Sequence, residues 1–91
     1  MKKKIAILGS TGSIGNSTLQ VIKKNKKDFD IVLLSAKNNY KKLIKQAKEF
    51  KVKNVIIYNQ LFYNIVKKSL RKNKTKVFLG NTPIGKIISK K

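Results

Sequence analysis

The sequence predicts an α/β fold built on a parallel sheet. Short apolar runs alternate with longer amphipathic segments along the chain, which is typical of parallel strands joined by right-handed helical crossovers. A glycine-rich segment directly follows the first apolar run, as it does in sheets that bind dinucleotides. We therefore expect a Rossmann-like parallel sheet with helices on both faces, in the order βαβαβαβ, which is incomplete for that fold.

Hydrophobic periodicity predicts the elements of the first part of the chain. Residues 5–8 are continuously apolar, as in a strand that is covered on both faces. Helical spacing of apolar residues predicts a helix over 14–24, and a second strand is expected at 29–34. The residues expected together on one face of this helix are Ile14, Thr18, Val21 and Ile22.

The second part repeats the alternation. A helix is predicted over 40–50, a strand at 55–58, a helix over 61–70 and a short strand at 77–79. Residues 80–91 begin a pattern compatible with a further helix. The fourth strand fits beside the first or beside the third, and this choice stays open. The apolar stripe of the third helix consists of Leu61, Phe62, Ile65, Val66 and Leu70.

The composition excludes several kinds of chemistry. The chain has no cysteine and no histidine, which excludes disulfides, thiolate or imidazole catalysis and the usual zinc ligands. Its three acidic residues, Asp28, Asp30 and Glu49, are not grouped at strand ends. Because a hard divalent cation needs several oxygen ligands, we predict no metal site in this chain.

The net charge of +20 attracts polyanions, so nucleic acid and anionic membranes must be considered as partners. The 23 basic residues are spread along the chain, and Arg71 is the only arginine, although the arginine fork is best suited to phosphate. Lysine, asparagine and isoleucine are abundant together, and their codons are A/T-rich. A drift in genomic base composition explains this pattern, so we expect no specific nucleic-acid partner.

The start of the chain resembles a secretion signal, with three lysines before residues 5–8. A signal needs an apolar stretch of roughly 7–15 residues, and this one ends after four, at Gly9. No stretch is long enough to cross a membrane. We therefore expect a cytoplasmic protein with no membrane partner.

The strongest motif is Gly-Ser-Thr-Gly-Ser-Ile-Gly at residues 9–15, between the first strand and the first helix. We expect Gly9 to allow the tight turn, Gly12 to let a pyrophosphate approach the main chain, and Gly15 to let the helix pack closely. The free N–H groups at the helix start would bind phosphate oxygens. Hydroxyl donors are expected from Ser10, Thr11 and Ser13.

The end of the second strand indicates which dinucleotide is bound. Enzymes that use NAD usually have an acidic residue there, which holds the ribose hydroxyl. Residues 35–39 are Ser-Ala-Lys-Asn-Asn and include no acid. A cation such as Lys37 suits a ribose 2′-phosphate, which favours NADP. The alternative is that Lys37 is one more surface lysine in a lysine-rich chain.

Residues 7–22 closely resemble the opening of the 1-deoxy-D-xylulose 5-phosphate reductoisomerases. Their sequence is Ile-Leu-Gly-Ser-Thr-Gly-Ser-Ile-Gly-Asn-Ser-Thr-Leu-Gln-Val-Ile. The likeness continues with Phe29, with Ala36-Lys37-Asn38 and with a helix that ends in Ala47-x-x-Phe50. It extends from Met1 to about Leu79. Many members have glycine where this chain has Ala36, which weakens that part of the match.

The resemblance implies a function. Members rearrange 1-deoxy-D-xylulose 5-phosphate in a divalent-metal site and reduce the product with NADPH to 2-C-methyl-D-erythritol 4-phosphate, in non-mevalonate isoprenoid synthesis. By similarity, NADPH would be held by Thr11, Gly12, Ser13 and Ile14 at the pyrophosphate, and by Lys37 and Asn38 at the adenosine phosphate.

The resemblance also implies what the chain lacks. Residues 1–91 would form a truncated NADP-binding domain, because a dinucleotide-binding domain needs roughly twice this length. The substrate and metal domain and the C-terminal domain would be absent, so the Mg or Mn ligands and all catalytic residues would lie elsewhere. The parent enzyme would bind a sugar phosphate and form a homodimer, and this part alone would be inactive.

Two other functions stay open. The cofactor domain of a different NADP-dependent oxidoreductase would share the glycine pattern but not the long match through residue 22. A small basic polyanion-binding protein would bind DNA or RNA with steep salt dependence and would not prefer NADPH over NADH.

Overall fold

A computed structural model describes residues 2–80 and 82. The predicted order of strands and helices is confirmed, with short 3₁₀ turns in three of the connections. The expectation for 80–91 falls almost entirely outside the described residues. The elements are β1 (Lys3–Ile7), α1 (Ser13–Lys24), β2 (Phe29–Ala36), α2 (Tyr40–Glu49), β3 (Asn54–Ile57), α3 (Tyr63–Ser69) and β4 (Lys76–Leu79).

The four strands form one parallel sheet in the order β1-β2-β3-β4. The fourth strand therefore lies beside the third, which settles the alternative that the sequence left open. The register between β1 and β2 shifts by one residue, because Ile5 pairs with Ile31 whereas Ala6 pairs with Leu33. Val32 is thus an extra residue of β2. Before Val32, the odd-numbered residues of β2 face the core between sheet and helices. After Val32, the even-numbered residues face it.

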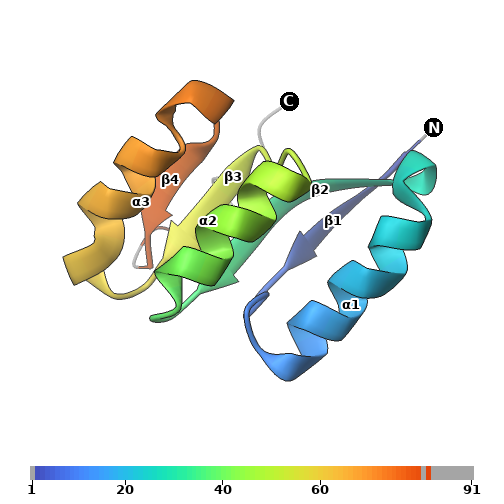
Figure 1. The fold of residues 1–91 in the computed structure, drawn as a ribbon, viewed down its shortest axis with the longest axis horizontal. Helices are drawn as coiled ribbons and strands as arrows, with labels where there is room; N and C mark the ends of the chain where they lie inside the picture. Colours follow the sequence, from blue (N-terminus) through green and yellow to red (C-terminus); the bar gives the residue numbers. More distant parts are fainter. Residues whose placement is uncertain (1, 81, 83–91) are drawn as a thin grey trace.

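All three α-helices lie against the same face of the sheet (Figure 1). A right-handed crossover that always moves to the next strand in one direction places every helix on the same side. The expected arrangement with helices on both faces is therefore not found among residues 2–80. The second face carries Leu33 and Ile56, which are fully buried. The core between sheet and helices contains Ile7, Leu19, Ile22, Ile31, Leu34, Ala36, Leu43, Ala47, Val52, Val55, Ile57, Val66 and Leu70.

Two predicted helix faces are wrong in part. On α1 the buried residues are Gly15, Leu19 and Ile22, whereas Ile14 is 85% and Val21 60% exposed. Both stripes have helical spacing, and the close approach of Gly15 to the preceding turn selects the one that faces the sheet. In the third predicted stripe, Val66 and Leu70 are buried, but Leu61 and Ile65 are exposed.

Among the described residues, no helix combines the length and the apolar character needed to cross a membrane.

Candidate functional site

The glycine-rich segment forms a tight turn between the end of β1 and the start of α1. Gly9 adopts a left-handed conformation, with φ of +69°, which glycine adopts without steric cost. The amide of Gly12 donates to the carbonyl oxygen of Gly9 at 3.0 Å and closes the turn. The role predicted for Gly9 is confirmed.

Helix α1 starts without a side-chain cap. Its N-cap residue is Gly12, and no acidic residue lies in the first turn. The first N–H groups of a helix have no partner within the helix and carry its positive partial charge. Helix α2 differs, since the Oδ1 atom of its N-cap residue Asn39 accepts from the amide of Lys42 at 3.3 Å. The start of α1 therefore has the geometry of an anion-binding site.

The other two glycines of the motif meet different surroundings. A Cβ atom at Gly15 would lie 2.5 Å from the carbonyl oxygen of Gly9 and 2.6 Å from the Cα atom of Ser10. Only glycine allows this approach, so the packing role predicted for Gly15 is confirmed. A Cβ atom at Gly12 would make only an ordinary 3.5 Å contact within the protein. The protein itself leaves room beside Gly12.

Ser10 does not have the expected role of a hydroxyl donor to phosphate. The residue is fully buried, and its hydroxyl lies 2.8 Å from the Oε1 atom of Gln46 and 3.3 Å from the carbonyl oxygen of Ser35. The Nε2 atom of Gln46 donates in return to the carbonyl oxygen of Ser10 at 3.0 Å. The hydroxyl of Ser10 is thus used inside the protein.

The sequence interpretation missed Gln46 and Ser35. The hydroxyl of Ser35 accepts from the amide of Gly9 at 2.9 Å, and its carbonyl oxygen accepts from the amide of Ser10 at 2.9 Å. A signal for Gln46 was present, because it is a polar residue three positions after Leu43 on the buried face of α2. Serine at the end of β2 gave no comparable signal.

These contacts bring both predicted halves of the site to the carboxyl edge of the sheet. Ser35 joins the glycine turn to the end of β2, next to Lys37 and Asn38. The Nζ atom of Lys42 in α2 also donates to the carbonyl oxygen of Thr11 at 3.4 Å. Thr11 is half-buried, and the other predicted cofactor residues are exposed, namely Gly12, Ser13, Ile14, Lys37 and Asn38.

A residue in the connection after β3 supports the Lys37 and Asn38 segment. The amide of Asn59 donates to the carbonyl oxygen of Lys37 at 2.9 Å, and its side-chain Nδ2 donates to Oδ1 of Asn38, also at 2.9 Å. Asn59 was not predicted. Lys37 and Asn38 are exposed directly after β2, and their role in cofactor binding stays a prediction.

The acidic residues of β2 and α2 are paired with lysines. Glu49 lies 2.9 Å from Lys23, and Asp30 lies 3.5 Å from Lys53. Within residues 2–80 and 82, no three histidine, cysteine or acidic residues come together in a way that could hold a metal ion. These ion pairs lie at the surface.

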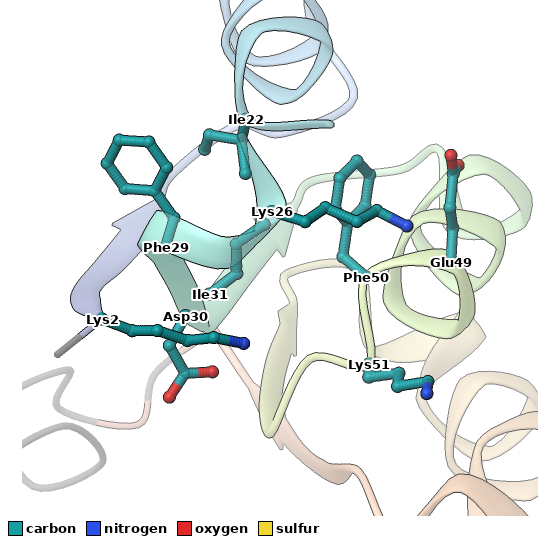
Figure 2. A pocket seen from close by; sticks show the side chains of 9 residues that line it. All are labelled: Lys2, Ile22, Lys26, Phe29, Asp30, Ile31, Glu49, Phe50 and Lys51. Atoms are coloured by element: carbon teal, nitrogen blue, oxygen red, sulfur yellow. The ribbon is translucent and has the colours of Figure 1, made fainter. Parts of the chain in front are cut away.

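A hollow of about 270 Å³ lies at the opposite, amino edge of the sheet (Figure 2). Figure 2 shows apolar side chains, lysines and acids lining the hollow, and the Nζ atom of Lys26 lies 5.7 Å from the ring centre of Phe50. The hollow lies at the carboxyl ends of α1 and α2, where helix dipoles disfavour anions. It is therefore a poor site for a pyrophosphate. The lining residues are Lys2, Ile22, Lys26, Phe29, Asp30, Ile31, Glu49, Phe50 and Lys51.

Comparison with known proteins places the chain in one enzyme family. The family model described as 1-deoxy-D-xylulose 5-phosphate reductoisomerase matches residues 5–91. The enzyme of that name from Pelagibacter ubique is 52% identical over 87 residues, which cover 96% of this chain and 22% of the relative. The Porphyromonas gingivalis enzyme is 44% identical over 89 residues, which cover 98% of this chain and 23% of the relative.

Solved structures give the same result. The Zymomonas mobilis reductoisomerase in complex with NADPH is 33% identical, with a TM-score of 0.83 over 87% of this chain and 21% of that one. A reductoisomerase in complex with NADPH, fosmidomycin and magnesium is 27% identical, with a TM-score of 0.86. The match covers 98% of this chain and 22% of that one. The chain thus spans about a fifth of the length of the relatives it matches.

Proposed function

The chain belongs to the 1-deoxy-D-xylulose 5-phosphate reductoisomerase family, and from this we propose that it is the NADPH-binding part of such an enzyme. The enzyme would rearrange 1-deoxy-D-xylulose 5-phosphate and reduce the product to 2-C-methyl-D-erythritol 4-phosphate. Bound NADPH supplies the hydride for the second step. The observation that carries the proposal is the uncapped start of α1, opened by a glycine turn that leaves space beside Gly12.

The residues present fit the cofactor. Main-chain N–H groups of Ser13 and Ile14 lie in the first turn of α1, where helix geometry leaves them without an intrahelical partner. Thr11 and Ser13 add hydroxyl groups, and Lys37 supplies positive charge for the 2′-phosphate. Lys37 and Asn38 follow β2 directly, so one ligand that runs along the carboxyl edge of β1 and β2 would reach both groups.

The rest of the enzyme would be supplied by the parts of the relatives that this chain does not match. We propose that the Mg or Mn ligands, the sugar-phosphate site and the catalytic residues belong to those parts, and that the enzyme is a cytoplasmic homodimer. The intact mass of the native protein tests this organisation. A product several times larger than 10.4 kDa supports it, and a stable product of 10.4 kDa contradicts it.

Cofactor binding is tested by titrating the protein with NADPH and NADH and following the fluorescence of the reduced nicotinamide. We expect NADPH to bind more tightly than NADH. Gly12→Leu should abolish this binding, because the side chain would fill the space through which a pyrophosphate approaches. No preference for NADPH, or unchanged binding by the variant, would contradict the proposal.

Because the net charge is +20, the alternative function to be tested is that of a non-enzymatic polyanion-binding protein. That function predicts binding to duplex DNA that weakens steeply with salt and that Gly12→Leu leaves almost unchanged. Turnover separates the proposed reaction from other NADP-dependent reductions. Intact protein with Mg²⁺ should oxidise NADPH only when deoxyxylulose phosphate is added.

A further inference from the structure

Gln46 of α2 makes two hydrogen bonds to the glycine turn. Its side-chain carbonyl accepts from the hydroxyl of Ser10 at 2.8 Å, and its amide donates to the carbonyl oxygen of Ser10 at 3.0 Å. Ser10 is 0% and Gln46 5% exposed. Because both side chains are buried, removing the amide of Gln46 takes a partner from buried polar atoms of Ser10, which costs more than the loss of an exposed hydrogen bond.

The other hydrogen bonds of the turn use its main-chain groups: the amides of Gly9, Ser10 and Gly12 donate, and the carbonyl oxygen of Thr11 accepts from Lys42. Space around the Cα atom of Gly9 is open, since a Cβ atom there would meet nothing within 4 Å, and Gly12 is exposed. Ser10 is the only fully buried residue between Leu8 and Ser13. Its pairing with Gln46, together with the strand contacts of Ser35, therefore determines where the turn lies.

Helix α2 also connects the two ends of the proposed site. It begins directly after the Lys37 and Asn38 segment, and Asn39 is its N-cap residue. Gln46 lies about two turns further along the same rigid helix, roughly 9 Å from Tyr40 at 1.5 Å per residue. A residue at this place sets the position of the glycine turn relative to the end of β2.

We propose that Gln46 is a positioning residue for NADPH. By holding Ser10 from both sides, it keeps the start of α1 in the conformation that receives the pyrophosphate, at a fixed distance from Lys37. Gln46 itself does not touch the cofactor. This inference rests on the proposed function, because it concerns the affinity for NADPH.

The test compares two variants of α2. Gln46→Met keeps the length of the side chain and removes both hydrogen bonds. Leu43→Ala removes a fully buried side chain of the same helix and keeps the hydrogen-bonding groups of Gln46 and Ser10, so it controls for a general loss of stability. The ligands are NADPH and adenosine 2′-monophosphate, which has the 2′-phosphate but no pyrophosphate. Binding is followed by NMR titration under conditions in which both variants are folded.

We expect Gln46→Met to raise the Kd for NADPH about tenfold, which corresponds to the net free energy of about one hydrogen bond. The Kd for adenosine 2′-monophosphate should stay unchanged. Leu43→Ala should change neither. An unchanged Kd of Gln46→Met for NADPH would overturn the inference, as would an equal effect of Leu43→Ala. If the unsubstituted protein does not bind NADPH, the proposed function itself has failed.

Gln46→Glu provides a second test that does not depend on the folding of the methionine variant. An ionised carboxylate cannot donate to the carbonyl oxygen of Ser10, whereas a protonated carboxyl can donate to it and still accept from the hydroxyl. Burial raises the pKa of a carboxyl group, so protonation of the introduced carboxyl falls within an accessible pH range. With the acid-stable NADP⁺ as ligand, the ratio of the Kd values of variant and unsubstituted protein should fall toward one as the pH is lowered. A ratio that does not change with pH would overturn the inference.

Discussion

The carbonyl oxygen of Gly9 lies so close to Gly15 that a Cβ atom at Gly15 would stand 2.5 Å from it. The two residues fix the start of α1 against the end of β1, and a second main-chain atom, the Cα of Ser10, would lie at 2.6 Å. This main-chain contact fixes the start of α1, whose first N–H groups have no partner within the helix.

Gly15→Ala should destabilise the fold. Alanine favours helices over glycine by about 1 kcal/mol, but here its methyl group would overlap main-chain atoms that cannot rotate away. We expect a net loss of about 1–3 kcal/mol, which is typical of an overpacked interior, measured as the free energy of unfolding in urea.

Gly12→Ala is the matched control for this prediction. A methyl group at Gly12 would make only a 3.5 Å contact, and φ of −80° is accessible to alanine. The expected loss is below about 1 kcal/mol, the usual difference between glycine and alanine at an N-cap. Equal stability losses in the two variants would contradict the proposed packing role of Gly15.

Asn39→Ala should weaken the start of α2. The variant removes the side-chain oxygen that accepts from the amide of Lys42, and the loss of an N-cap of this kind costs about 1 kcal/mol. Asn39→Asp keeps an oxygen in the same position and should be about as stable as the unsubstituted protein. Urea unfolding of both variants checks this, and an aspartate variant as unstable as the alanine variant would argue against capping.

Lys74→Gly should stabilise the fold. Lys74 has φ of 58° and ψ of 24° at the end of a 3₁₀ turn, and this left-handed conformation costs a residue with a side chain about 1–2 kcal/mol. Glycine avoids that cost but gains freedom in the unfolded chain, so the net gain expected is up to about 1 kcal/mol. Lys72→Gly removes the same charge at a residue with negative φ and should destabilise, as a thermal melt of both variants would show.

The strands and helices could be predicted because each depends on local apolar periodicity. The bulge at Val32 could not, since it appears only in the register between two strands. The exposed positions of Ile14 and Val21 were also missed, because α1 carries two stripes of similar spacing and Gly15 decides between them. In the candidate site, the residues of the glycine turn could be predicted because they form a local sequence motif. Ser10 and Gln46 are separated by 36 residues, so their pairing depends on how α2 packs.

Cofactor selectivity should depend on Lys37 more than on other lysines near the site. The side chain is exposed directly after β2, and it is expected to contact the 2′-phosphate that distinguishes NADPH from NADH. Lys37→Ala should raise the Kd for NADPH about tenfold, toward the low end for a hydrogen bond between charged groups because water screens an exposed pair. The Kd for NADH should not change, which fluorescence titration of both cofactors would show.

Lys41→Ala is the matched control for this prediction, since it removes the same charge from an exposed position in the first turn of α2. If binding depended only on the net charge of +20, the two variants would lose affinity equally and the loss would shrink as salt is added. A specific contact predicts that only Lys37→Ala reduces the ratio of NADPH to NADH affinity. Equal losses of affinity in the two variants would show that Lys37 acts as an ordinary surface lysine. The cation after β2 would then no longer favour NADP over NAD.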